Sequence, residues 1–284
     1  MSQSLKTIGS LFSGIGGLEM GLEWATGART LFQVEQDQYC RSVLKKHWPN
    51  ACRKITDVKN ITADNVPAVD ILCGGFPCQD ISTCGSGEGI NGKKSKLWFE
   101  FDRIIRDIRP GYVVLENVPA LTTRGLGVVL GSLAAIGYNA QWGVLSAAAV
   151  GAPHLRRRIF IIGKMANANS KQRQTRRIPI GIQEEQLEPN SIRDSVANAN
   201  SIRLPGPGQP IDASNTTQNR KRKTNKLVNV RIGDHWKTEP GLGRVANGVP
   251  NRSHRLRALG NAVVPQVSYQ VGLRLVNYAR EVTL

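Results

Sequence analysis

Long hydrophobic runs are absent from this chain of 284 residues. No apolar stretch reaches the ~18 residues that a membrane-spanning helix needs. Residues 1–6 lack the apolar run of a signal peptide, so we expect no secretion signal there. The five cysteines lie between Cys40 and Cys84, and their odd number argues against the disulfide framework of a secreted protein. The spacing of Cys73, Cys78 and Cys84 differs from that of zinc ligands, so we expect no metal site. We therefore expect a soluble protein of the cytoplasm, without membrane contact.

Aromatic residues are missing between Met165 and His235, where Asn, Gln, Arg, Ser and Pro dominate. Few large apolar groups are available there for a packed core. Two interpretations stay open for residues 165–225, a solvated or disordered insertion and an ordered recognition domain.

Acidic residues are scarce in the second half of the chain. Residues 151–284 hold 23 Lys and Arg against 8 Asp and Glu, whereas residues 1–150 hold 15 against 13. Nearly all of the net charge of +17 therefore arises after residue 150. A surface of this kind favours a polyanionic partner, most often nucleic acid; a solubilising tail and a membrane-surface patch are the alternatives.

The first 164 residues alternate between short apolar runs and amphipathic segments. We predict strands over residues 6–12, 30–35, 69–73, 112–116 and 158–162, and helices over 18–24, 38–47, 97–108 and 266–280. Continuous apolar strands that alternate with helices indicate an α/β fold whose mainly parallel sheet is buried on both faces.

A glycine-rich loop follows the first predicted strand. The sequence Phe12-Ser13-Gly14-Ile15-Gly16-Gly17 lies where this strand passes into a helix, whose free N–H groups suit a ligand. The loop differs from Gly-x-Gly-x-x-Gly, which disfavours a nicotinamide dinucleotide. Glu35 ends the next strand, where a carboxylate can accept hydrogen bonds from ribose hydroxyls. Taken alone, the loop could bind a nucleotide phosphate or an adenosyl sulfonium cofactor, or form only a tight turn.

Reactive side chains flank three later strands. Pro77 and Cys78 follow one buried strand, Glu116 ends the next, and Arg156 and Arg158 lie where another begins. The carboxyl ends of parallel strands meet at one edge of an open α/β sheet, so we expect Cys78 and Glu116 to lie side by side. A thiolate near cationic groups fits nucleophilic catalysis.

Five motifs occur in a fixed order: Phe-x-Gly-x-Gly-Gly, Pro-Cys-Gln, Glu-Asn-Val, Arg-x-Arg and Gly-Asn-Ala-Val. The series resembles that of the DNA cytosine-5 methyltransferases, in their compact prokaryotic or phage form, over about residues 1–164 and 240–284. The resemblance implies a Rossmann-like S-adenosylmethionine-dependent methyltransferase fold. It also implies a catalytic, cofactor-binding domain over 1–164, a small basic target-recognition region over 165–243 that is partly disordered, and a segment over 244–284 that returns to the catalytic domain.

The resemblance assigns roles residue by residue. It implies that Cys78 adds to C6 of a flipped cytosine, that Glu116 holds N3 and N4 of the base, and that Arg156 and Arg158 lie near it. It further implies that Phe12, Gly14, Gly16, Gly17, Glu35, Asp57, Val58, Pro77, Leu97, Asn261 and Val263 bind S-adenosylmethionine. The implied reaction is methyl transfer to C5 of a cytosine in a specific sequence of double-stranded DNA.

Other properties are expected on the same ground. We expect a monomer that acts near the nucleoid of a bacterial or phage-infected cell, and a cognate restriction endonuclease is a possible partner. The sequence departs from the family at His154, where Gln is usual, and at Lys96, where Gly often precedes the leucine.

Alternative functions remain open. A tRNA-methylating relative is one, although the Cys-Phe-Thr stretch of that branch is absent from this chain. Another is a nucleic-acid-binding module without catalysis, in which Pro77 and Cys78 are only structural. A nicotinamide-dependent oxidoreductase is the third, and the pattern of the glycine loop disfavours it.

Overall fold

The structure is a computed structural model that describes residues 5–77, 97–166, 176–177, 248 and 250–280. The chain divides into two compact units, Met1–Gly181 with Gly233–Leu284, and Ile182–Ile232. The second unit lies outside the described residues, as does most of the predicted recognition region. The domain boundaries at residues 164 and 243, and the partial disorder between them, therefore stay predictions.

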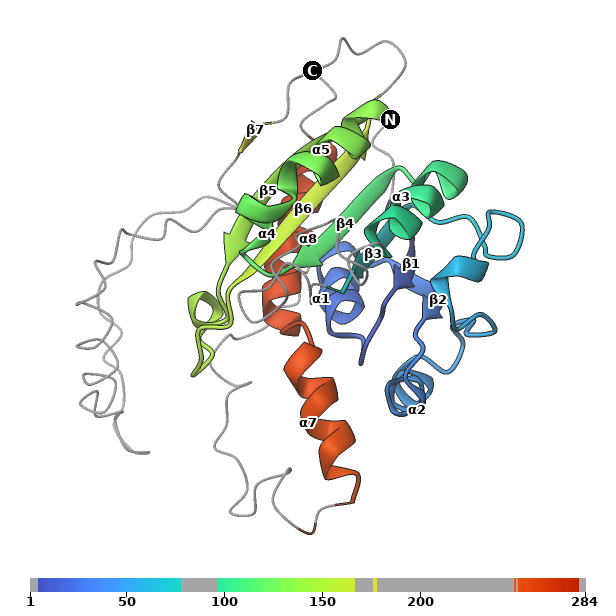
Figure 1. The fold of residues 1–284 in the computed structure, drawn as a ribbon, viewed down its shortest axis with the longest axis vertical. Helices are drawn as coiled ribbons and strands as arrows, with labels where there is room; N and C mark the ends of the chain where they lie inside the picture. Colours follow the sequence, from blue (N-terminus) through green and yellow to red (C-terminus); the bar gives the residue numbers. More distant parts are fainter. Residues whose placement is uncertain (1–4, 78–96, 167–175, 178–247, 249, 281–284) are drawn as a thin grey trace, which may run out of the picture. The chain divides into compact units, whose positions relative to one another are not determined.

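A seven-stranded sheet forms the centre of the first unit (Figure 1). Its strands are β1 (Thr7–Leu11), β2 (Arg29–Val34), β3 (Ile71–Gly75), β4 (Tyr112–Asn117), β5 (Tyr138–Leu145), β6 (Arg158–Met165) and β7 (Arg176–Arg177), in the order β2-β1-β3-β4-β6-β5-β7. β1 pairs in parallel with β2 and β3, and β3 pairs in parallel with β4. β6 runs antiparallel to both β4 and β5. The predicted α/β fold with a mainly parallel sheet is confirmed.

Helices cover both faces of this sheet. Successive strand residues point to opposite faces, so each face contributes side chains to a hydrophobic core of its own. Leu72 and Val113 belong to one hydrophobic core, whereas Ile71 and Val114 belong to the other. The first core is closed by α3 (Leu97–Ile108) and α5 (Leu126–Ala135), and the second by α1 (Gly17–Thr26) and α8 (Pro265–Arg280). The remaining helices are α2 (Gln38–His47), η1 (Val58–Asn60), α4 (Leu121–Arg124), η3 (Ala148–Val150) and α7 (Arg252–Asn261).

The first and last helices of the described chain are in close contact. A β-carbon on Gly21 would lie 2.0 Å from Ser268 Oγ, and one on Gly272 would lie 2.5 Å from the β-carbon of Ala25. The Ser268 hydroxyl also donates a hydrogen bond of 2.8 Å to the carbonyl of Gly17. Small residues therefore bring α8 against α1, and with it the segment that precedes α8.

Most predicted elements agree with the structure, including the helices over 38–47 and 97–108, whose bounds coincide with α2 and α3. The elements that the sequence did not predict include β5, β7, α4, α5 and α7. None of the helices in the described part of the chain combines the length and the apolar character that crossing a membrane requires.

Candidate active site

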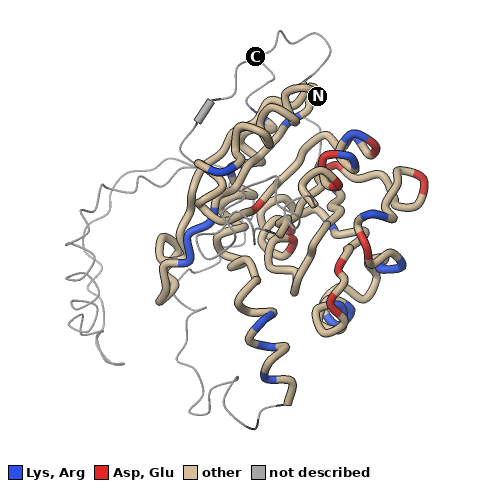
Figure 2. The backbone as a smooth tube through the Cα atoms, in the orientation of Figure 1, with Lys and Arg blue, Asp and Glu red and all other residues tan. Residues whose placement is uncertain are grey.

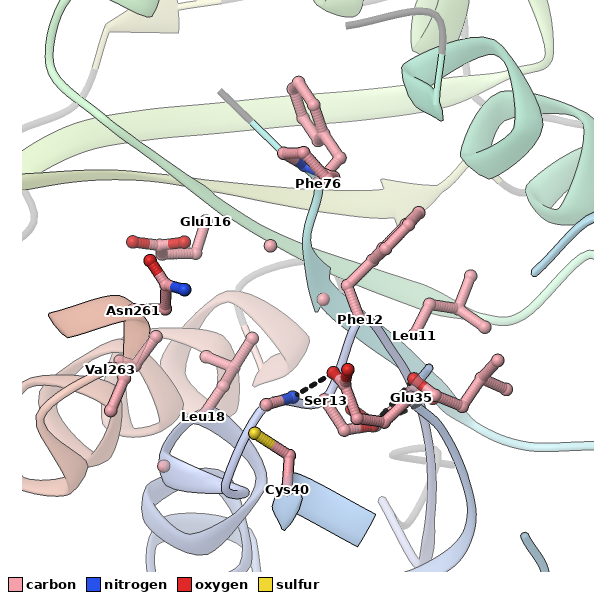
Figure 3. A pocket seen from close by; sticks show the side chains of 18 of the residues that line it. Leu11, Phe12, Ser13, Leu18, Glu35, Cys40, Phe76, Glu116, Asn261 and Val263 are labelled. Carbon is pink, nitrogen blue, oxygen red and sulfur yellow. Dashed lines mark hydrogen bonds between the residues drawn. The ribbon is translucent and has the colours of Figure 1, made fainter. Parts of the chain in front are cut away.

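A cavity of about 350 Å³ opens at the carboxyl ends of β1, β2, β3 and β4 (Figure 3). β1 lies between β2 and β3, so the strand order changes direction here, and open α/β sheets bind their ligands at such points. The volume lies at the lower end of the ~300–1,000 Å³ that is typical of small-molecule sites.

The glycine loop after β1 forms one wall of the cavity. Phe12 and Gly14 both adopt left-handed backbone conformations, with φ angles of 55° and 57°. Glu35 holds this loop, because its Oε2 accepts a hydrogen bond of 2.8 Å from the Gly14 N–H. Its Oε1 accepts another of 2.8 Å from the Asp37 N–H, just before α2. The loop and the start of α2 are thereby fixed to each other through one carboxylate.

The structure brings most of the predicted cofactor-binding residues together in the cavity wall. These are Phe12, Gly14, Gly17, Glu35, Val58, Pro77, Leu97, Asn261 and Val263. Two others, Gly16 and Asp57, are not among the residues that line the cavity. A β-carbon on Gly16 would meet the Trp48 ring at 2.4 Å, and the Asp57 carboxylate accepts a hydrogen bond from the Lys59 N–H at the start of η1.

The far wall of the cavity comes from the end of α7 and the segment between α7 and α8, with Asn261 and Val263 on the same side of Figure 3 as Glu116. Arg156, whose φ angle is 30°, holds this segment. Its Nη2 donates hydrogen bonds of 2.8 Å to the Gly260 carbonyl and 2.5 Å to the Ala262 carbonyl. Burial lowers the pKa of Arg156. The predicted arginine segment and the Gly-Asn-Ala-Val motif are thus joined directly.

Glu116, at the end of β4, forms an ion pair with Arg158 of β6, with Nε and Oε1 separated by 3.0 Å. The strands β4 and β6 are adjacent, which places both residues at the cavity. Only 12% of the Glu116 side chain is exposed. Burial raises the pKa of Glu116 to about 7, although Arg158 and Arg156 act in the opposite direction. The carboxyl group can therefore hold or release a proton near neutral pH.

Asn117 is a site residue that sequence reasoning missed. Its Nδ2 donates a hydrogen bond of 3.0 Å to the Phe76 carbonyl, and its Oδ1 accepts one from the Val118 N–H. The end of β4 thus fixes the chain immediately before Pro77. A polar residue at the buried end of an apolar strand was the signal that could have identified it. Cys78, the predicted nucleophile, lies outside the described residues.

Two of the described cysteines, Cys40 and Cys73, have unreactive settings. Cys40 lines the cavity, and burial, together with Glu35 and Asp37, raises its pKa to about 12. Burial also raises the pKa of Cys73. Thiols of this kind stay protonated at neutral pH and are poor nucleophiles. Within the described ranges, no group of three or more His, Cys, Asp or Glu side chains could hold a metal ion.

The model of one protein family, "C-5 cytosine-specific DNA methylase", matches residues 6–238, most of the chain. The chain belongs to this family. Among curated relatives, it is 37% identical over 162 residues to the type II methyltransferase M.NgoBI of Neisseria gonorrhoeae. The aligned stretch covers 56% of this chain and 50% of that protein. The chain is 36% identical, with the same coverage, to M.HaeII of Haemophilus aegyptius. The chain thus spans about half the length of these relatives.

Solved methyltransferase structures share the fold. The Entamoeba histolytica methyltransferase EhMeth covers 97% of this chain, with 99% of its own length matched, a TM-score of 0.59 and 16% identity. A mutant of Spodoptera frugiperda DNMT2 covers 61% of this chain and 54% of its own length, with a TM-score of 0.50 and 20% identity. The Rossmann-like methyltransferase fold expected from the sequence is confirmed.

Proposed function

We propose that this protein transfers a methyl group from S-adenosylmethionine to C5 of a flipped cytosine in double-stranded DNA. The observation that carries the proposal is the buried Glu116 carboxyl, which has a pKa of about 7 and is paired with Arg158 at the cavity. Membership of the C-5 cytosine-specific DNA methylase family supports the same reaction.

The cavity fits the proposed cofactor. Phe12, Val58 and Leu97 supply apolar surface for an adenine ring, and the oxygens of Glu35 have lone pairs left for ribose hydroxyls. The start of α1 offers N–H groups and a positive helix end for the carboxylate of an amino acid. When bound, S-adenosylmethionine supplies a methyl group on a positively charged sulfur.

The chemistry of cytosine explains the need for a nucleophile. C5 of an aromatic ring attacks a methyl group poorly, so we propose that the Cys78 thiolate first adds to C6. This addition forms the S–C6 bond and moves the ring electrons towards C5 and N3. C5 would then take up the methyl group as the bond from the methyl carbon to the sulfonium sulfur breaks and leaves a neutral thioether. C5 loses its proton to a base, and the S–C6 bond breaks to return the thiolate. Atoms and charge balance, because the methyl group replaces one proton.

The residues of this chain that assist these steps are Glu116, Arg158 and Asn117. A protonated Glu116 can donate a hydrogen bond to N3 as negative charge develops there. Arg158 contacts Glu116 at 3.0 Å and fixes the orientation of its carboxyl group. Asn117 holds the Phe76 carbonyl and so positions the chain that leads to Cys78. Because C6 of a stacked base is inaccessible, the cytosine has to leave the helix.

Replacing the proposed nucleophile tests this function. We expect Cys78→Ala to abolish the transfer of labelled methyl groups to DNA and to retain DNA binding, measured by filter binding. Cys52→Ala is the matched control, because Cys52 is partly exposed and does not line the cavity. Bisulfite sequencing of DNA from cells that express the wild-type protein should identify the methylated sequence.

Two outcomes would contradict the proposal. Transfer by Cys78→Ala at the wild-type rate would remove Cys78 from the mechanism. Methylation of tRNA, with no transfer to duplex DNA, would replace the proposed substrate.

Location and partners form part of the same proposal. We infer that the protein acts as a monomer in the cytoplasm, near the nucleoid, and on a specific duplex sequence. The likeness to type II methyltransferases supports a role in restriction–modification beside a cognate endonuclease.

A further inference from the structure

Glu19 is a buried acidic residue that the proposed reaction does not use. It lies in the first turn of α1, directly after the glycine loop, and in the wall of the cavity. Its exposed fraction is 0%. Oε1 accepts a hydrogen bond of 3.3 Å from Gln33 Nε2, whereas Oε2 is buried and has no hydrogen-bond partner among the described residues.

An oxygen in this position costs free energy unless a partner reaches it. Burial raises the pKa of Glu19, and the nearby hydroxyls of Ser10 and Ser13 and the Gln33 amide only partly offset that effect. The Ser13 hydroxyl donates its own hydrogen bond to Ser10 Oγ, at 2.9 Å. A buried carboxyl group with a free oxygen is stabilised most by a cationic donor.

The other acidic side chains of the cavity wall already have partners. Glu35 accepts hydrogen bonds on both oxygens, from Gly14 and Asp37. Asp37 accepts from the Cys40 N–H and pairs with Arg257, and Glu116 pairs with Arg158. Among the described residues that line the cavity, Glu19 is the acidic residue with a buried oxygen that accepts no hydrogen bond.

We propose that Glu19 binds the α-ammonium group of the cofactor's amino acid moiety, an inference that rests on the proposed function. The start of α1 is suited to the carboxylate of that moiety, since helix N-termini bind anions. In an α-amino acid the ammonium group is attached next to the carboxylate. A side chain in the first turn of the same helix is therefore well placed to reach it.

Two ligands that differ in the amino acid moiety test the proposal. S-adenosylhomocysteine contains the α-ammonium group, whereas methylthioadenosine keeps the adenosine and the sulfur and lacks the amino acid. We expect Glu19→Gln to weaken the binding of S-adenosylhomocysteine about tenfold or more and that of methylthioadenosine less than about twofold, as measured by isothermal titration calorimetry.

Glu23→Gln is the matched control on the same helix. Glu23 accepts hydrogen bonds from Trp48 Nε1 and the Thr30 N–H and does not line the cavity. Its substitution should leave the ratio of the two affinities unchanged. Circular dichroism of each variant reports whether it folds.

A third ligand makes the test independent of how well the variant folds. The deaminated analogue of S-adenosylhomocysteine should bind the wild-type protein about tenfold more weakly than the parent compound, and Glu19→Gln should add no further loss. Equal losses of affinity for S-adenosylhomocysteine and for methylthioadenosine in Glu19→Gln would overturn the proposal. Equal affinities of the wild-type protein for S-adenosylhomocysteine and its deaminated analogue would also overturn it. A wild-type protein that binds none of the ligands contradicts the proposed function instead.

Discussion

The surroundings of Glu116 act on the pKa of its carboxyl group in opposite directions. Burial at the end of β4 favours the neutral carboxyl, whereas the guanidinium groups of Arg158 and Arg156 favour the carboxylate. Burial prevails and leaves the pKa at about 7. Gly75 contributes by its lack of a side chain, because a β-carbon there would lie 2.5 Å from Glu116 Oε2. The carboxyl group can therefore change its charge state under physiological conditions.

The stability of the protein should report this pKa. Between pH 4.5 and about 7 the folded protein keeps a proton on Glu116 that the unfolded chain has lost. The free energy of unfolding should therefore fall as pH rises through this window, by at most about 3 kcal/mol from this group. We expect urea unfolding at pH 5 and pH 7.5 to show a larger fall for the wild-type protein than for Glu116→Gln. Equal falls in the two proteins would contradict the assignment.

Sequence reasoning located side chains with familiar chemistry and missed those that act through neighbours. Phe12 and Asn261 belong to motifs and Glu35 ends a predicted strand, and the structure brings all three to one cavity. The roles of Asn117 and Glu19 came only from their contacts: the sequence shows a polar residue at the end of an apolar strand, but neither the hydrogen bond to a carbonyl 41 positions away nor the unpaired oxygen. The cofactor and catalytic roles themselves stay predictions.

At the scale of elements, the contact between α1 and α8 is the feature on which the cavity depends. Gly21 and Gly272 let the two helix backbones approach, and Ser268 bonds to the start of α1. A β-carbon on Gly17 would lie 2.0 Å from the carbonyl oxygen of Val263. The glycine loop and the segment before α8, which form two walls of the cavity, are therefore also in contact. Separation of the helices would widen the cavity.

Adding one methyl group at this contact should destabilise the protein. We expect Gly21→Ala to lower the free energy of unfolding by about 1–3 kcal/mol, since the new group meets Ser268 and the backbone of Pro265. Gly131→Ala, inside α5, is the control with the opposite sign. A β-carbon there has nothing within 4 Å, so helix propensity should raise stability by up to about 1 kcal/mol. Chemical denaturation measures both, and equal effects of the two substitutions would contradict the packing.

The elements that sequence patterns missed have physical reasons for being missed. In β5, Asn139 and Gln141 interrupt the apolar run, and the structure compensates by pairing the buried Gln141 with Arg274. In α7 the buried residue is Ala258, so no apolar face repeats at helical spacing. Strand direction also eluded prediction, because the apolar run of β6 is compatible with either orientation.

At the scale of the whole molecule, charge is distributed unevenly along the chain. The tube of α7 carries Arg252, Arg255 and Arg257 and no acidic residue, whereas the segments around α2 and α3 mix both signs (Figure 2). Residues 151–284 account for nearly all of the net charge of +17. A polyanion such as duplex DNA would be attracted mainly by this half of the sequence.

Binding to DNA should therefore depend strongly on salt. If about six phosphates are neutralised, we expect the association constant for duplex DNA to fall about a thousandfold between about 50 and 200 mM NaCl. The affinity for S-adenosylhomocysteine should change less than about threefold over the same range, because the cofactor has few exposed charges to screen. Fluorescence anisotropy and calorimetry give the two values. DNA affinity independent of salt would contradict an electrostatic interface.

The cavity wall is assembled from opposite regions of the polypeptide. Phe12 and Glu35 are synthesised early, whereas Asn261 and Val263 arrive more than 200 residues later, attached to the helix that packs on α1. A growing chain consequently lacks one wall of the cavity until these last residues have been synthesised. Any ligand that needs both walls can therefore bind only after the segment that precedes α8 is in place.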